Sequence, residues 1–369
     1  MRMSTLRKLA QRLVLLVVTL LLCEGLLQAG YRVVCHRWLF TTEPADPYGM
    51  FLPHPYLAIT PEPNAERHFN HITISHNAAG WRGRDLLQPK TRKRIVVVGG
   101  SSTYCVGVDD TETYPAQLQR RLGDGYEVIN LGVPAYSSVE HIIQTALWFS
   151  DIQPDIAIYY MGWNDAHNMH VRDLKADYSD FHGPLVQTIP RPRRGWWPQH
   201  FALARLPHIA VSELRHAFHK LPSYRVNYPG LRFGPTDTAW TPQWEERPLS
   251  LYRRNADEIA QLCKAQGVTP LFVPQLYNTA ALTNAVDPYW PFVNMKDCPA
   301  LIDAYNRVLS DVGRADGVTV ATEVAPSVFV PQDFLDQVHL SAAGCRKMAE
   351  ILEKQVRTIQ TSWTPSPAR

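Results

Sequence analysis

The residues of this chain that could do chemistry stand in four short motifs, each next to a predicted strand or helix. The motifs are Gly99-Gly100-Ser101-Ser102-Thr103, Asn130-Leu131-Gly132, Gly162-Trp163-Asn164-Asp165 and Asp336-Gln337-Val338-His339. An enzyme that attacks an ester carbonyl needs a hydroxyl, an imidazole, a carboxylate and amide donors for the oxyanion. Each motif alone is weak, because a DxxH pair is more often a helix cap beside a surface histidine. Together they predict a nucleophilic active site.

Ser101 is the candidate nucleophile, and it needs a base within hydrogen-bonding distance, because a serine hydroxyl is unreactive near neutral pH. We expect His339 to take its proton and Asp336 to fix the tautomer of the imidazole. The adjoining Ser102 stays open as an alternative nucleophile. Asp165 is expected to be structural rather than catalytic.

An alternation of strands and helices from residue 92 onward must position these motifs. Apolar β-branched runs predict buried strands over residues 94–98, 126–130 and 155–160, and one of the first three motifs follows each of them. Further strands are predicted over 269–273 and 317–321, and helices over 113–122, from 137, 249–266, 300–312 and 342–359. This order predicts a three-layer α/β/α sandwich with a mostly parallel, flavodoxin-like sheet. In such a sheet, active groups collect at the carboxyl ends of the strands.

The four motifs, in this order, resemble the sequence blocks of the SGNH (GDSL) hydrolase family over about residues 94–358. This chain carries Gly100 where the first block of the family has Asp. The resemblance implies a serine esterase that uses no cofactor and no metal. It implies a triad and an oxyanion hole as follows: Ser101, Asp336 and His339 as the triad, and the N–H groups of Ser101 and Gly132 with the side-chain amide of Asn164 as the hole.

A further stretch, Asn77-Ala78-Ala79-Gly80-Trp81-Arg82-Gly83, resembles the N-x-x-G-[FW]-R segment ahead of the catalytic core in some bacterial members of that family. The apolar N-terminus and the long insert after Asn164 also resemble membrane-tethered members.

The N-terminus predicts a membrane anchor. Four basic residues precede an apolar run over 13–22: Arg2, Arg7, Lys8 and Arg12. Apolar character continues to about residue 34, which is long enough to span a bilayer, and no small-x-small cleavage site follows. We therefore favour an uncleaved single-pass anchor in the inner (cytoplasmic) membrane over a cleaved signal peptide, with the catalytic domain on the periplasmic or extracellular side. Glu24 and Gln28 share a helix face, which either packs on a partner or snorkels to the interface.

Composition excludes some partners and sites. The net charge of +3 is too small for a nucleic-acid-binding protein. The six cysteines form no CxxC pair, which argues against the usual zinc and redox motifs. Cys105 reads as a core residue, and Cys263 and Cys298 could pair outside the cytoplasm. The histidines away from the DxxH motif read as solvated surface residues rather than metal ligands: His68, His71, His76, His167 and His170.

The pattern divides the chain into an N-terminal tip and anchor (1–34), a stalk or wrapping segment (35–91), a catalytic domain (92–360) and a tail of disordered composition (361–369). Residues 166–247 form an insert that we expect to act as a lid. It contains Arg194, Trp196 and Trp197, which could bind an acylated or anionic polysaccharide, since Trp stacks on sugars and Arg holds carboxylates. A lid core and contact with the bilayer are the other interpretations.

Three functions stay open at this point. The first is hydrolysis of an acyl ester on a cell-surface or secreted glycan or lipid. The second is O-acyl transfer to a polysaccharide through the same triad. The third is a non-catalytic envelope or polysaccharide-binding scaffold, against which the intact motif set argues.

Overall fold

The computed structural model describes residues 3–35, 38, 50–52, 54, 57, 59–69, 72–168, 176–177, 201–204, 246–283 and 297–361. The chain divides into two units, one of Met1–Gly49 with Ile189–Arg225 and one of Met50–Thr188 with Val226–Arg369. The second unit contains all four motifs.

The first unit contains one long helix, α1 (Met3–Cys35). Its segment Arg7–Val33 has 27 residues, and the most apolar 18 consecutive residues in it have a mean hydropathy of 2.2. At 1.5 Å per residue this is about 40 Å of helix, more than the roughly 30 Å of a bilayer's hydrocarbon core. Length and composition therefore fit a membrane anchor or a signal sequence.

The polar face of α1 makes contacts within the chain. Glu24 accepts hydrogen bonds from the Gln28 side chain (2.8 Å) and from the backbone N–H groups of Ala202 (2.6 Å) and Leu203 (2.9 Å). Of the two interpretations of this face, packing is therefore the one that the contacts favour, and the packing partner is part of the insert.

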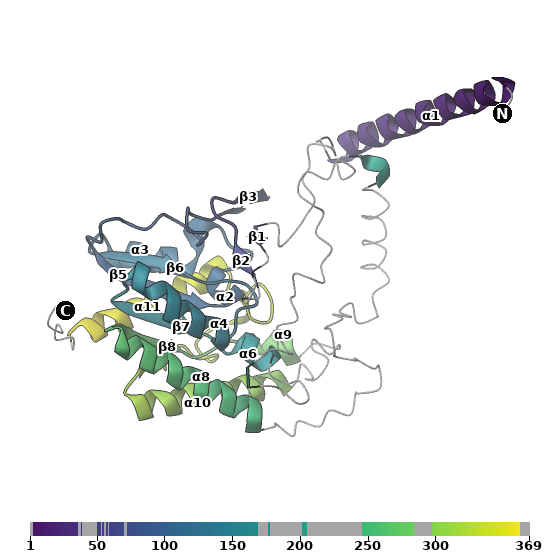
Figure 1. Ribbon diagram of the computed structural model, residues 1–369. Helices are drawn as coiled ribbons and strands as arrows, with labels where there is room; N and C mark the ends of the chain where they lie inside the picture. The colour runs from purple at the N-terminus through teal and green to yellow at the C-terminus, as the bar shows by residue number, and fades with distance from the viewer. Residues whose placement is uncertain are drawn as a thin grey trace. The chain divides into compact units, whose positions relative to one another are not determined.

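The second unit is built on a five-stranded sheet in the order β6-β5-β7-β8-β9, in which all pairs are parallel (Figure 1). The strands are β5 (Lys93–Gly99), β6 (Tyr126–Asn130), β7 (Ile156–Tyr160), β8 (Thr269–Val273) and β9 (Thr319–Val320). Alternate residues of β5 enter different cores, Val96 and Val98 on one face and Ile95 and Val97 on the other. The apolar run is continuous because both faces are buried.

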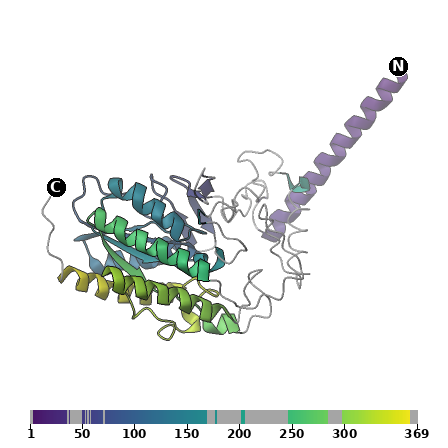
Figure 2. The same cartoon turned by 60° about the horizontal axis from the view of Figure 1, so that its bottom comes forward.

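Helices cover both faces of this sheet, so the predicted three-layer α/β/α sandwich is confirmed. On one face lie α3 (Tyr114–Leu122) and α11 (Ala342–Thr361). On the other lie α4 (Ser138–Ile143), α8 (Glu246–Ala265) and α10 (Cys298–Asp316), with α8 and α10 side by side (Figure 2). The shorter helical segments are α2 (Ser101–Tyr104), a 3-10 turn (Asp110–Glu112), a π-helical turn (Gln144–Trp148), α5 (Phe149–Ile152), α6 (Trp163–Asn168), α9 (Thr279–Thr283) and a second 3-10 turn (Pro331–Asp333).

Helix caps follow the sequence closely, whereas one helix end differs. Thr113 caps α3 by accepting from the Ala116 N–H, and Ser137 caps α4 through Glu140. The helix predicted to end at residue 312 continues to Asp316. A Cβ added at Gly313 would lie 2.5 Å from a methyl group of Val320, so glycine lets the helix continue while strand β9 packs closely on it.

The described residues from Met50 to Ser75 pack against α2 and the turn that follows β6. They form the hairpins β1 (Phe51–Leu52) with β2 (Thr60–Pro61) and β3 (Glu66–Phe69) with β4 (Ile72–Ser75). Phe51, Ile59 and Ile74 share a small core with Tyr104 and Tyr136.

His76, which was expected on the surface, is buried, so that prediction is wrong. Its ring contacts the Tyr104 hydroxyl (2.8 Å) and the Glu62 carbonyl (3.0 Å). Desolvation lowers the pKa of His76 to about 4. His68 is exposed as expected, and His71 lies outside the described residues.

Cys263 and Cys298, which could have paired, are not joined by a disulfide. Both are buried, and the Cys263 sulfur lies 3.2 Å from the Tyr159 hydroxyl. Cys105 is in the core as expected, and its sulfur lies 3.9 Å from that of Cys345.

Candidate active site

The carboxyl ends of β5, β6 and β7 bring the first three motifs to one edge of the sheet. Ser101 begins α2 directly after β5, Asn130 is the last residue of β6, and Asn164 lies in α6 just after β7. The fourth motif lies in the loop that leads to α11. The Phe334–Leu340 bridge and a hydrogen bond from Leu335 N–H to the His339 carbonyl (2.7 Å) close this loop.

A hydrogen-bonded chain links the three candidate triad residues. His339 Nε2 lies 2.8 Å from Ser101 Oγ, and His339 Nδ1 lies 2.7 Å from Asp336 Oδ2. Because a carboxylate only accepts, Nδ1 carries the proton and Nε2 is left to accept from the serine hydroxyl. Ser101, rather than the alternative Ser102, is the serine at this imidazole.

The loop backbone orients Asp336. Its Oδ1 accepts from the backbone N–H groups of Val338 (2.9 Å) and His339 (2.8 Å). Burial acts to raise the pKa of Asp336, but the hydrogen bonds and the charge of the His339 side chain, with the two N–H bonds, hold it below its usual value. Asp336 is therefore ionised at neutral pH and can stabilise an imidazolium.

The side-chain amide of Asn164 lies close to the turn just before Ser101. Its Nδ2 donates to the Tyr136 carbonyl (2.8 Å), and a Cβ added at Gly100 would lie 2.5 Å from that nitrogen. Glycine at position 100 therefore leaves room for the Asn164 side chain.

The Gly132 N–H, a predicted oxyanion donor, forms a hydrogen bond inside its own turn. It donates to Asn130 Oδ1 (2.9 Å), and a Cβ added to this glycine would lie 2.3 Å from the Tyr104 nitrogen. In this structure Gly132 lets the turn pack against α2, and its amide already has an acceptor.

The next turn contains a residue that sequence reasoning missed. Ala135 has a φ of 70°, the left-handed region that an alanine rarely adopts, and it precedes Tyr136, which binds Asn164. Nothing in the local sequence marks an alanine for that conformation.

The arrangement can support acyl transfer to a serine hydroxyl. A model of the GDSL-like Lipase/Acylhydrolase family matches residues 97–347, which contain all four motifs. The chain belongs to this GDSL-like hydrolase family.

Solved structures of GDSL-like hydrolases are similar at low identity. A GDSL-like lipase from Bacteroides thetaiotaomicron is 15% identical over 74% of this chain and 93% of that chain, with a TM-score of 0.42. A lipase/acylhydrolase from Enterococcus faecalis is 14% identical over 75% of this chain and 100% of that chain, with a TM-score of 0.41. An acetyl xylan esterase is 12% identical over 71% of this chain and 99% of that chain, with a TM-score of 0.40. No curated protein sequence matches the chain.

A small pocket of this GDSL-like hydrolase opens beside Ser101. Its lining residues are Gly100, Ser101, Ser102, Tyr136, Met161, Gly162, Trp163, Asn164 and Gln275. Gln275, which sequence reasoning missed, is buried, and its side-chain amide donates to the Tyr160 hydroxyl (3.1 Å). The sequence signal for Gln275 was only its position just past β8.

Asp165 links α6 to α4 through hydrogen bonds in this hydrolase. This agrees with the structural role expected for it. It is fully buried and accepts hydrogen bonds from the N–H (2.9 Å) and the hydroxyl of Ser138, whose oxygen also accepts from Asn255 (2.7 Å). Burial raises the pKa of Asp165 to about 7, although the bonds from Ser138 oppose the shift.

The raised pKa of Asp165 predicts a pH-dependent stability. Between its unfolded pKa near 4 and about 7 the folded state holds the extra proton, so stability is expected to fall as pH rises through this window. We expect thermal unfolding midpoints of Asp165→Asn to fall less between pH 5 and pH 8 than those of the wild type. An equal dependence of the unfolding midpoint on pH in the two proteins would contradict the raised pKa of Asp165.

The contact between position 100 and Asn164 predicts the effect of Gly100→Ala. The added methyl group should displace the Asn164 amide and lower kcat roughly tenfold to a hundredfold, because it disturbs a candidate oxyanion donor. The unfolding midpoint should change little, because a side-chain end can move. Asn164→Ala gives the reference loss in the same kinetic assay, and full activity of Gly100→Ala would show that Asn164 is not needed where it lies.

Several expected residues are outside the described part of the chain. They are Arg194, Trp196, Trp197 and His170. Among the residues that the structure describes, no group of three or more His, Cys, Asp or Glu side chains could hold a metal ion.

Proposed function

We propose that this protein is a serine esterase that hydrolyses an acyl ester, on a cell-surface or secreted glycan or lipid, through an acyl-enzyme. The observation that carries the proposal is the chain of hydrogen bonds from Ser101 through His339 to Asp336, with distances of 2.8 Å and 2.7 Å. It joins a nucleophile, a base and an orienting carboxylate.

In the proposed mechanism, Ser101 Oγ attacks the ester carbonyl while His339 takes its proton. Asp336 stabilises the imidazolium, which then gives the proton to the leaving alcohol. Water, activated by the same imidazole, attacks the acyl-enzyme and releases the acid. The oxyanion would be held by the Ser101 N–H and the Asn164 amide. The engaged amide of Gly132 would have to leave Asn130 to take part.

The other parts of the chain have proposed places too. We assign residues 1–34 to an uncleaved anchor with its basic end in the cytoplasm, 35–91 to a wrapping segment, and 92–360 to a catalytic domain on the periplasmic or extracellular side of the inner membrane. The insert 166–247, with Arg194, Trp196 and Trp197, would act as a lid that contacts a glycan. The apolar helix and its basic start support the anchor.

The test is covalent labelling of the full chain in detergent with a fluorophosphonate probe, followed by peptide mass spectrometry. The esterase proposal predicts a phosphonyl group on Ser101 and turnover of simple acyl esters. A folded protein that neither takes up the probe nor turns over any ester of an acyl-length panel would refute it and favour the scaffold.

A further inference from the structure

The segment Asn77–Gly83, which no step of the mechanism uses, folds into a tight turn that presents Arg82. Asn77 Oδ1 accepts from the Trp81 N–H (2.9 Å), and the Asn77 N–H donates to the Trp81 carbonyl (2.8 Å). Gly80 has a φ of 89°, and an added Cβ there would lie 2.7 Å from the Pro61 carbonyl oxygen. The Asn and the Gly of this motif therefore serve to place the Arg.

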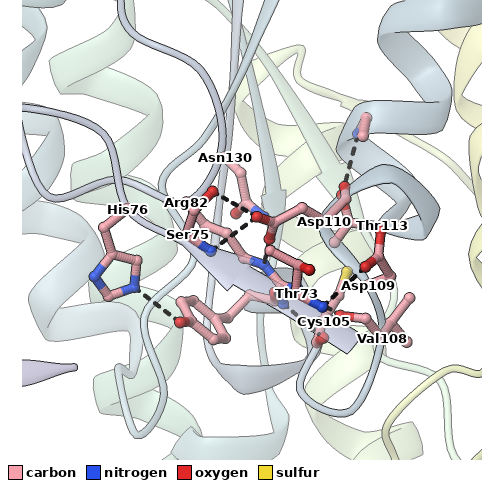
Figure 3. Close-up of polar contacts among 12 residues, drawn as sticks. Thr73, Ser75, His76, Arg82, Cys105, Val108, Asp109, Asp110, Thr113 and Asn130 are labelled. Carbon is pink, nitrogen blue, oxygen red and sulfur yellow. Dashed lines mark hydrogen bonds and ion pairs between the residues drawn. The ribbon is translucent and has the colours of Figure 1, made fainter. Parts of the chain in front are cut away.

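The Arg82 guanidinium is buried against the turn that follows the nucleophile's helix (Figure 3). Its Nε forms an ion pair with Asp110 Oδ1 (2.7 Å). Its terminal nitrogens donate to the backbone carbonyls of Tyr104, Cys105 (2.8 Å) and Val108. Bonds from a charged donor to buried carbonyls are stronger than bonds between neutral groups.

These bonds matter because the hydrogen bonds within α2 alone do not fix its position. A helix of one turn leaves most of its carbonyls without a partner inside the helix. The Thr103 carbonyl accepts from Asn130 Nδ2 (3.0 Å), and the carbonyls of Tyr104 and Cys105 accept from Arg82. Cys105 also has a φ of 61°, a conformation that needs outside support in a non-glycine residue.

The same segment holds α2 through the Tyr104 side chain. Arg82 Cζ lies 4.9 Å from the centre of the Tyr104 ring, and His76 Nε2 bonds its hydroxyl at 2.8 Å. Asp110 Oδ2 in turn accepts from the N–H (2.8 Å) and the hydroxyl (2.6 Å) of Ser75 (Figure 3). β4 and the turn after it therefore hold α2, the helix that begins with Ser101, in place through contacts with Tyr104.

We propose that Arg82 is a positioning residue for the nucleophile. By holding the last carbonyls of α2, it keeps Ser101 Oγ at hydrogen-bonding distance from His339 Nε2. Arg82 itself touches no substrate in this proposal. The inference rests on the proposed esterase function, since it concerns the reactivity of Ser101. A displacement of about 1 Å in a reacting group can lower a rate about a hundredfold.

The chain offers a matched control in Arg94. This arginine is also buried, pairs with Glu127 (2.7 Å) and donates to the carbonyls of Leu87 (2.7 Å) and Ile152. It stands near the start of β5, whereas Ser101 follows the end of that strand. Loss of the Arg94 guanidinium should lower the unfolding midpoint and leave the position of Ser101 unchanged.

The experiment compares Arg82→Lys and Arg94→Lys in the full chain, because lysine keeps the charge and loses the planar fork. Unfolding midpoints, fluorophosphonate inactivation rates, kcat and KM are measured on both. We expect both midpoints to fall. Arg82→Lys should slow inactivation and lower kcat by roughly tenfold to a hundredfold with KM within about threefold, and Arg94→Lys should stay within about threefold in every rate.

Rescue and a second variant make the test decisive. Methylguanidinium should restore part of the inactivation rate of Arg82→Ala and leave Arg94→Ala unchanged. If the Arg82 variants do not fold, Asp110→Asn, which keeps the guanidinium and removes its charged partner, is expected to slow inactivation at least threefold. Inactivation of folded Arg82→Lys at the wild-type rate, or equal slowing in Arg94→Lys, would overturn the inference. A wild type that takes up no probe would instead refute the esterase proposal.

Discussion

Ser101→Ala is expected to abolish fluorophosphonate labelling and to lower ester turnover by about a millionfold, to the level left by binding and oxyanion donors. The reason is that His339 Nε2, 2.8 Å from the Ser101 hydroxyl, is positioned to take its proton. Turnover of a chromogenic ester and gel fluorescence of the labelled protein measure the two effects.

Ser102→Ala is the neighbouring comparison. Ser102 is buried in α2, and Ser101 stands at the imidazole, so we expect the Ser102 variant to keep its labelling. Labelling that survives Ser101→Ala and disappears in Ser102→Ala would move the nucleophile by one residue and require α2 to turn.

Asp336→Asn should lower kcat by about ten-thousandfold with little change in KM. The present carboxylate accepts from two backbone N–H groups and from His339 Nδ1. An amide in its place can present an N–H to Nδ1, which reverses the imidazole tautomer and leaves Nε2 unable to accept from Ser101. Steady-state kinetics at saturating substrate measure the effect.

Asp333→Asn is the matched control in the same loop. Asp333 is buried and pairs with Lys347 and the Val330 N–H, so its loss should lower the unfolding midpoint while folded molecules keep turnover within about tenfold of the wild type. Retention of more than a tenth of wild-type kcat by Asp336→Asn would mean that His339 needs no orienting carboxylate.

The strands were predictable because a run of apolar β-branched residues is a local property. The ranges 126–130 and 269–273 agree with β6 and β8 residue for residue. The predicted strand at 317–321 shortens to Thr319–Val320, because it lies at the sheet edge and pairs with β8 alone. Where a strand ends depends on its neighbour, and the neighbour is set by topology.

The contacts made by the residues that surround the candidate site were not predictable from local sequence pattern. His76 resembles a surface histidine in sequence, yet its ring meets Tyr104, 28 residues away. Gln275 and Ala135 carry no motif at all. His76 and Gln275 contact tyrosine hydroxyls supplied by other elements, and those groups are brought together only when the sheet and its helices pack.

The sequence by itself determined which chemical groups this hydrolase has: a serine, a histidine, an aspartate and an asparagine in ordered blocks around alternating strands and helices. Reactive groups belong to residue types, and secondary structure follows from short-range periodicity. Only the tertiary structure decided that Ser101 meets His339 across 238 residues of chain and that Arg82 binds the carbonyl of Tyr104 at the end of α2. A hydrogen bond forms or fails within a few tenths of an ångström, and only the packing of distant segments defines such a distance.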